Sequence, residues 1–211
     1  MSTVTRWWWV RHAPVPTGQG MVYGQMDLDA DCTDAPSFRA LASYLPTDAV
    51  LVTSDLKRTT QTADAIRDAG LAMPPAIVEP ALREQSFGDW QGMTHEAFAA
   101  LGDTVEHRHW RAPAFTRAPN GENFADLIAR VAPAINRLST THEGVDIVAV
   151  AHGGTIRAAM ALALGLDPER ALAFSTVNLG VTRLDYITDL AEGVAWRVTG
   201  VNWNPQFAVL R

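Results

Sequence analysis

The sequence predicts an α/β fold, a three-layer α/β/α sandwich in which helices cover both faces of a mostly parallel central sheet. Short apolar runs alternate with longer segments of helical character along most of the chain. The last two apolar runs, in contrast, follow one another with no helical segment between them. Alternating strands and helices favour parallel strands joined by helical crossovers, whereas consecutive strands favour antiparallel pairing.

The first strand is predicted at Arg6–Val10, where three consecutive tryptophans indicate burial on both faces of a sheet or at the edge of a cleft. Glycines and prolines over residues 14–24 then predict a long loop. A helix is predicted at Ser37–Leu45, which stops before Pro46. The β-branched run Ala49–Thr53 predicts the second strand.

Ser54 or Asp55 is expected to cap the next helix, which runs to about Ala69. A short strand is expected at Ala76–Val78. The segment Leu82–Gly92 contains two glycines and is interpreted as a shaped loop.

The third part of the chain begins with helical spacing over Gly121–Leu138, where Pro133 is expected to kink the helix or disturb a turn. The clearest strand is Asp146–Ala151, and it leads through His152 and two glycines into a helix at Thr155–Leu164. Two final strands, expected to be antiparallel, are Val181–Tyr186 and Ala195–Val201.

These elements are interpreted as a single domain over residues 1–211, because one hydrophobic core supports chains of up to about 250 residues. Residues 93–120 are expected to form a lid or insertion. That segment is rich in proline, arginine and histidine and has weak periodicity apart from a short helix at His95–Leu101.

Composition excludes several classes of protein. The chain has 17 basic and 23 acidic residues, a net charge of −6, and no basic stripe of the kind that nucleic-acid binding requires. Its apolar runs are shorter than the ~20 residues that cross a bilayer. The N-terminus lacks the pattern of a secretory signal, and Cys32 is the single cysteine, so a cytoplasmic protein without internal disulfides is expected.

Polar residues follow three of the predicted strands. The first strand ends in Arg11 and His12, the second is followed by Ser54 and Arg58, and the third ends in His152. If the strands are parallel, these residues meet at one edge of the sheet, where open α/β sheets bind ligands. Two arginines, two histidines and the N-termini of two helices would form an anion site suited to phosphate.

A neutral imidazole in such a site is a competent nucleophile toward phosphorus. Neighbouring cations favour the neutral form, whereas a bound phosphate dianion favours the charged form. Cleavage of an ester also requires a proton for the leaving oxygen, which a carboxylic acid supplies. Glu84, in the loop Leu82–Gly92, is the favoured candidate, and Asp89 is the alternative.

Four motifs together resemble the histidine phosphatase superfamily, the phosphoglycerate-mutase-like group. They occur in family order and are Arg11-His12-Ala13, Ser54-x-x-x-Arg58-Thr59-x-x-Thr62, Leu82-x-Glu84-x-x-Phe87-Gly88-x-Trp90-x-Gly92 and His152-Gly153-Gly154. The resemblance implies a phosphoglycerate-mutase-like fold, His12 as the nucleophile that forms a phosphohistidine, and Glu84 as the proton donor. It further implies that Arg11, Arg58, His152 and Gly153 bind the phosphoryl group, with no metal or other cofactor.

Two positions depart from the family pattern. The glycine that usually follows the first histidine is Ala13, and the asparagine often found six residues after that histidine is Gly18. The second departure removes a phosphate-contacting side chain, and Ser54 or Thr17 is expected to compensate.

The loop Phe87–Gly92 resembles the phosphatase branches more than the glycolytic mutases. Together with Asn120-Gly121-Glu122 and Val177-Asn178 it is most similar to α-ribazole-phosphate phosphatases. The expected function is therefore hydrolysis of a small phosphorylated metabolite, with α-ribazole 5′-phosphate as one candidate. The alternatives are a phosphoglycerate-type mutase and a non-catalytic module that binds phosphorylated ligands. A serine hydrolase is excluded, because the sequence has no Gly-x-Ser-x-Gly motif.

Some polar residues of the lid are open to two interpretations. His107 and His109 are expected to be solvated rather than to form a metal site, because no carboxylate pattern accompanies them. Arg111 and Arg117 are either solvated or in contact with an anionic substrate. An exposed tryptophan would be compatible with a homodimer.

Overall fold

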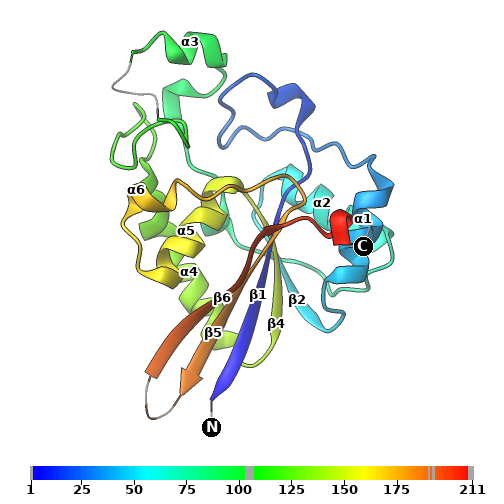
Figure 1. Cartoon of the computed structure of the whole chain (residues 1–211). Coiled ribbons are helices and arrows are strands. Elements are labelled where there is room, and N and C mark those ends of the chain that lie inside the picture. Colours follow the sequence, from blue (N-terminus) through cyan, green and yellow to red (C-terminus); the bar gives the residue numbers. More distant parts are fainter. Residues whose placement is uncertain (1, 103–106, 190, 192, 209–211) are drawn as a thin grey trace.

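The computed structural model describes residues 2–102, 107–189, 191 and 193–208. The predicted fold class is confirmed, since a single six-stranded sheet forms the centre of the molecule (Figure 1). Its strands are β1 (Thr3–Arg11), β2 (Ala49–Thr53), β3 (Ile77–Val78), β4 (Asp146–Ala151), β5 (Val181–Asp189) and β6 (Gly193–Trp203).

The order of strands across the sheet is β3-β2-β4-β1-β5-β6. The first four strands in that order are parallel, whereas β5 is antiparallel to β1 and β6 is antiparallel to β5. The predicted antiparallel pair at the end of the chain is thus confirmed, and it extends one edge of a parallel sheet.

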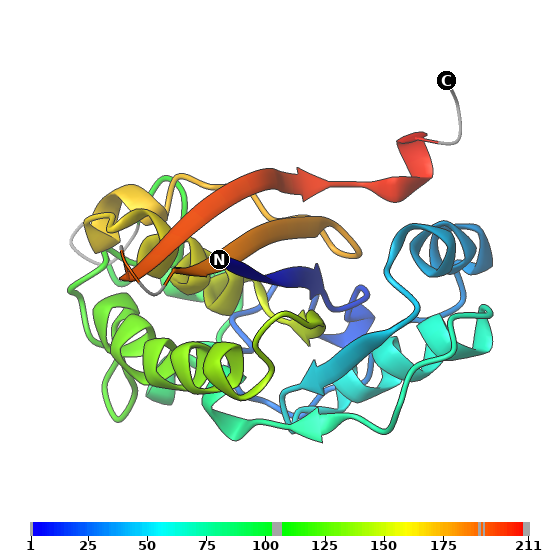
Figure 2. The ribbon, with the colours of Figure 1, turned by 90° about the horizontal axis from the view of Figure 1, so that it is seen from below.

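Helices lie on both faces of the sheet (Figure 2). One layer contains α1 (Ala35–Tyr44) and α2 (Lys57–Asp68), and the other contains α4 (Phe124–Thr141), α5 (Gly153–Leu164) and α6 (Pro168–Ala171). Each layer buries its own apolar cluster against the sheet. The short helix α3 (His95–Ala99) lies above the end of the sheet instead (Figure 1).

The three consecutive tryptophans of β1 pack against the helices on both faces of the sheet. Trp7 and Trp9 are fully buried on the side of α4 and α5, and their rings are stacked with centroids 4.8 Å apart. Trp8 points to the opposite face and packs edge-on against Tyr44 of α1. Alternation of side chains along a strand explains this division, and it confirms the prediction that the segment is buried on both faces.

One local expectation is corrected by the structure. Neither Ser54 nor Asp55 caps α2: Leu56 is the N-cap and offers no side-chain acceptor, because Ser54 bonds to a histidine and Asp55 pairs with Arg83. Helix α4 continues through Pro133, the position at which the sequence predicts a kink or a disturbed turn. The apolar face of α4 packs against the main core, and this burial outweighs the ~3 kcal/mol that an interior proline costs.

The register of the parallel strands aligns their carboxyl ends. Arg11 of β1 pairs with Ala151 of β4, and Thr53 of β2 pairs with Val150. His12 continues the pairing, because its backbone N–H donates to the carbonyl of Ala151 at 2.9 Å. The residues that follow these three strands are therefore neighbours at the upper end of the sheet in Figure 1.

Loops cover this end of the sheet (Figure 1). They share a small apolar cluster, separate from the two main ones, whose buried members are Val22, Phe87, Trp90, Phe98, Ala112 and Ala118. The expected lid over residues 93–120 contributes to this cluster, and residues 103–106 of that segment lie outside the described part of the chain. The 3₁₀ turns η1 (Pro16–Gly18), η2 (Pro80–Leu82) and η3 (Gly88–Trp90) shape the other covering loops.

Within the described ranges, no helix has both the length and the apolar character needed to cross a membrane.

Candidate active site

His12 lies at the end of β1 and is almost completely buried, with 1% of its surface exposed. Its Nδ1 atom is 2.7 Å from the carbonyl oxygen of Ala13. A carbonyl only accepts hydrogen bonds, so Nδ1 carries the proton in the neutral ring and the lone pair is on Nε2. The imidazole is thus held in the tautomer that leaves Nε2 as a nucleophile.

His152 is the N-cap residue of α5, and its ring centroid is 5.2 Å from that of His12. Nε of Arg58 donates to Nδ1 of His152 at 3.2 Å, and Nε2 of His152 lies 2.8 Å from Oγ of Ser54. Because an arginine only donates, Nδ1 is the acceptor and Nε2–H donates to the serine. Ser54 therefore orients His152, a role that replaces the helix cap expected of it.

Arg58 is fully buried in the first turn of α2. Besides its bond to His152, it donates to the backbone carbonyls of Met26 and Gly24 at 2.8 and 2.6 Å, and its guanidinium lies over the ring of Tyr23. These contacts fix the guanidinium beside the two histidines.

Arg11 lies next to His12 and is held by the backbone carbonyl of Thr176, to which it donates at 2.6 Å. Its Nε atom is buried and has no hydrogen-bond partner in the part of the chain that the structure describes. The predicted convergence of Arg11, His12, Arg58 and His152 is therefore what the structure shows.

Both histidines are electrostatically biased toward the neutral form. Burial, followed by the charges of Arg58 and Arg11, lowers the pKa of His12 well below its ordinary value, although the bond to Ala13 raises it. Burial and Arg58 are also the main causes that lower the pKa of His152 well below its ordinary value. Near neutral pH, therefore, His12 retains the lone pair that nucleophilic attack requires.

This burial predicts a pH-dependent stability. An unfolded chain protonates its histidines below about pH 6.5 while folded His12 and His152 stay neutral, so acidification favours the unfolded state. We expect the free energy of unfolding to fall as pH decreases from 7 to 5, by up to about 1.4 kcal/mol per pH unit for each of the two residues. Urea unfolding at a series of pH values measures this slope.

The matched controls for the slope are two substitutions. His12→Asn keeps a donor for the Ala13 carbonyl and should reduce the slope, whereas His109→Gln, at an exposed position, should leave it unchanged. A stability that does not change between pH 7 and 5 would contradict neutral burial of the two rings.

Glu84 lies in the irregular segment between η2 and η3, with 8% of its surface exposed. The backbone N–H of Gly154, at the start of α5, is 3.1 Å from both carboxylate oxygens, and the N–H of Gln85 donates to Oε1 at 2.9 Å. A Cβ atom on Gly154 would collide with Oε1, so this glycine is required for the close approach. Glu84 and His152 are thus both held at the N-terminus of the same helix.

Tyr23 occupies the space next to Gly18. A Cβ atom on Gly18 would be 2.6 Å from Cδ1 of Tyr23, so a larger residue there would displace the ring. Tyr23 in turn stacks on Arg58. Of the two residues expected to compensate for the absent asparagine, Ser54 lies inside the site, whereas Thr17 is exposed in η1.

Two cavities open beside these groups. One, of about 60 Å³, is lined by Arg11, Tyr23, Glu84, Trp110 and Arg111 among others. The second, of about 350 Å³, shares Arg11, Tyr23 and Arg111 with it and extends along the loop of residues 14–21.

The two arginines of the lid have different environments. The half-buried Arg111 faces the site, whereas Arg117 pairs with Asp126 on the surface.

Arg157 of α5 is a buried cation that the motifs alone do not identify. It donates to the carbonyl of Gly153 and to Oγ1 of Thr176, its guanidinium lies 4.5 Å from the ring centre of Trp110, and burial lowers its pKa to about 10. A signal for it exists in the sequence, because Arg157 is the only charged residue in the apolar helix α5.

Asp89 and His107 have other partners. Asp89, the alternative proton donor, accepts from the side chain of Asn120 on the surface. The expectation that His107 is solvated is wrong, because its side chain is 15% exposed and pairs with the carboxylate of Glu169 at 2.8 Å, whereas His109 is exposed. No group of three or more metal-type ligands occurs within the described residues.

Comparison with known proteins gives consistent matches. The profile of the histidine phosphatase superfamily (branch 1) matches residues 7–199. A glucosyl-3-phosphoglycerate phosphatase of Mycolicibacterium vanbaalenii is 32% identical over 216 residues, which cover 94% of this chain and 95% of the relative.

Solved structures agree with this match. The native structure of a mycobacterial glucosyl-3-phosphoglycerate phosphatase has a TM-score of 0.81 at 26% identity, covering 95% of this chain and 99% of that one. A protein provisionally assigned as an alpha-ribazole-5′-P phosphatase, from Escherichia coli, has a TM-score of 0.74 at 21% identity, covering 95% of this chain and 97% of that one. At the latter identity the similarity shows a shared fold alone.

Proposed function

Because the chain belongs to the histidine phosphatase superfamily and is a phosphatase, we propose that it hydrolyses a small phosphorylated metabolite without a metal ion, through a phosphohistidine on His12. The observation that carries the proposal is the neutral, Nδ1-protonated ring of His12, held beside His152, Arg58 and Arg11. Arginine donors bind an oxyanion directly and need no bridging cation.

The reaction proceeds in two steps. In the first, Nε2 of His12 attacks phosphorus, the bond from phosphorus to the alcohol oxygen breaks, and Glu84 gives that oxygen a proton. In the second, Glu84 takes a proton from a water molecule that attacks the phosphohistidine. The phosphorus–nitrogen bond then breaks, inorganic phosphate leaves, and both side chains regain their initial forms.

The remaining groups stabilise the transferring phosphoryl group. Arg11 and Arg58 supply positive charge and the N-terminus of α5 supplies its helix dipole, while His152, bonded to Arg58 and Ser54, lies beside the phosphoryl group, so charge that develops on the oxygens meets preoriented groups.

The loops beyond the phosphate site are expected to choose the substrate. Tyr23, Trp110 and Arg111 line the cavities there, and these residues lie outside the strand ends that carry the chemistry. The names of the relatives suggest two candidate substrates, glucosyl-3-phosphoglycerate and α-ribazole 5′-phosphate.

A panel assay tests the proposal. Phosphate release from glucosyl-3-phosphoglycerate, α-ribazole 5′-phosphate, 3-phosphoglycerate and p-nitrophenyl phosphate is measured with and without EDTA. We expect hydrolysis that the chelator does not reduce, and a phosphoryl group recovered on His12 after an alkaline quench and mass spectrometry.

Three results would contradict the proposed function. Loss of activity in EDTA would exclude the metal-independent route. Interconversion of 2- and 3-phosphoglycerate faster than phosphate release would indicate a mutase. Binding of phosphate without turnover of any ester would indicate a binding module.

A further inference from the structure

The carboxylate of Glu84 is held only by backbone N–H groups among the described residues, those of Gln85 and Gly154. Its own backbone lies in the segment between η2 and η3, which is neither helix nor strand. The location of the carboxylate therefore depends on whatever fixes the path of residues 81–86.

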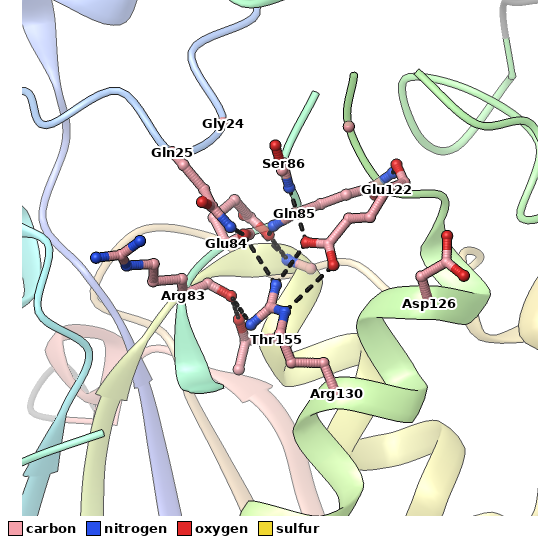
Figure 3. A network of polar contacts seen from close by, with 12 residues as sticks. Gly24, Gln25, Arg83, Glu84, Gln85, Ser86, Glu122, Asp126, Arg130 and Thr155 are labelled. Carbon is pink, nitrogen blue, oxygen red and sulfur yellow. Dashed lines mark hydrogen bonds and ion pairs between the residues drawn. The ribbon is translucent and has the colours of Figure 1, made fainter. Parts of the chain in front are cut away.

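Arg130 of α4 contacts this path directly (Figure 3). Its Nη1 atom donates to the carbonyls of Ala81 and Arg83 at 2.7 and 3.2 Å, and its Nη2 atom donates to the carbonyl of Glu84 at 3.2 Å. The other two donors reach the carboxylate of Glu122, from Nη2 at 2.5 Å and from Nε at 3.2 Å. All five N–H donors of this guanidinium thus have acceptors.

Glu122 holds the other side of the same segment. Its Oε1 atom accepts from the backbone N–H of Ser86 at 2.8 Å, and its own N–H donates to the carbonyl of Ser86 at 2.9 Å. The side chain of Gln85 donates to the carbonyl of Glu122 at 3.0 Å. Glu84 therefore lies between residues that Arg130 fixes and residues that Glu122 fixes (Figure 3).

We propose that Arg130 and Glu122 are positioning residues for proton transfer, which hold the carboxyl group of Glu84 at the leaving oxygen of the substrate. This inference rests on the proposed function. Their side chains are 26% and 14% exposed, so the pair is largely shielded from water. A shielded, bidentate arginine–carboxylate pair has a defined geometry, which a flexible surface pair lacks.

A second ion pair on α4 offers a matched control. Arg137 pairs with Glu79, which precedes η2, and so also joins this helix to the start of the loop. The Arg137 side chain is 59% exposed and has no direct bond to residues 81–86 within the described part of the chain, and its partner Glu79 reaches only the N–H of Ala81. If any link between α4 and the loop were needed for activity, loss of either ion pair would lower kcat. If Arg130 and Glu122 position Glu84, only loss of their own pair lowers kcat.

The test uses two conservative variants of the full chain. Arg130→Lys keeps the charge but has three donors on one atom for five acceptors, and Glu122→Gln keeps the size and one acceptor oxygen. We expect kcat for an alkyl phosphate to fall about 10- to 100-fold with little change in KM, since a displacement of about 1 Å costs that much. For p-nitrophenyl phosphate, whose leaving group needs no proton, the loss should be much smaller.

A second measurement separates positioning from general destabilisation. In a Glu84→Gln background the same two substitutions should cause no further loss with the alkyl phosphate, because residues that act through one group are not additive. Arg137→Gln should leave kcat of both esters unchanged in either background. Urea unfolding of each variant confirms that the assayed protein is folded.

The outcomes distinguish the inference from the function on which it rests. Equal losses on both esters, or a full further loss in the Glu84→Gln background, would overturn the positioning role. If the parent protein hydrolyses neither ester, or Glu84→Gln slows both equally, the proposed function fails first.

Discussion

His12→Asn is expected to abolish turnover while the protein remains folded. The amide nitrogen of asparagine takes the place of Nδ1 and still donates to the carbonyl of Ala13, but no atom takes the place of Nε2. Loss of a covalent nucleophile lowers kcat on the order of 10⁴-fold or more. Phosphate release from p-nitrophenyl phosphate measures the loss, and intact-protein mass spectrometry shows whether any phosphoenzyme forms.

The control for this variant is His109→Gln, at an exposed position of the lid, which should keep the activity of the parent. If the His12→Asn variant kept a turnover close to that of the parent protein, His12 would not be the nucleophile and the reaction would not proceed through a phosphohistidine at that position.

Glu84→Gln is expected to slow esters in proportion to their need for a proton. In the native protein Oε1 accepts from both Gly154 and Gln85, so a glutamine oxygen at that place preserves these two bonds, but the N–H groups of the amide are too weakly acidic to protonate the leaving oxygen. A general acid contributes about 10²–10⁴-fold, and we expect a loss of that order for an alkyl phosphate. The loss for p-nitrophenyl phosphate should be far smaller.

A plot of log kcat against the pKa of the leaving alcohol measures this difference. The slope should become steeper in the variant, because the departing oxygen then bears its negative charge unaided. Parallel plots for parent and variant would show that Glu84 does not transfer the proton.

Most of the fold was predictable because its strands are strongly patterned. Ala49–Thr53 and Asp146–Ala151 were predicted with the bounds that the structure shows, since both strands are buried on two faces and are apolar apart from Thr53 and Asp146 at their ends. Strand order was not predictable, because it depends on pairings such as that of Trp8 with Val148, which residues far apart in the sequence make.

The convergence of the candidate phosphate-binding residues was predictable from the strand pattern as well. His12, Arg58 and His152 follow strand ends, and parallel strands bring their ends together.

Tyr23, Arg130 and Arg157 were not identified, because each acts through a contact that only the folded chain creates. Tyr23 lies in a loop whose sequence has no periodicity, and the helical pattern of α4 does not distinguish Arg130 from Arg137.

The register of the central strands has a consequence for how this kind of enzyme diversifies. The proposed nucleophile is attached to the hydrogen-bonded sheet, because His12 follows β1 and its backbone N–H donates to the carbonyl of Ala151 in β4. Tyr23 and Trp110, in contrast, lie in covering segments outside the sheet and line the cavity beside the site. Substitutions in the covering segments can therefore change which metabolite is bound, while the position of His12, fixed by the sheet, stays the same.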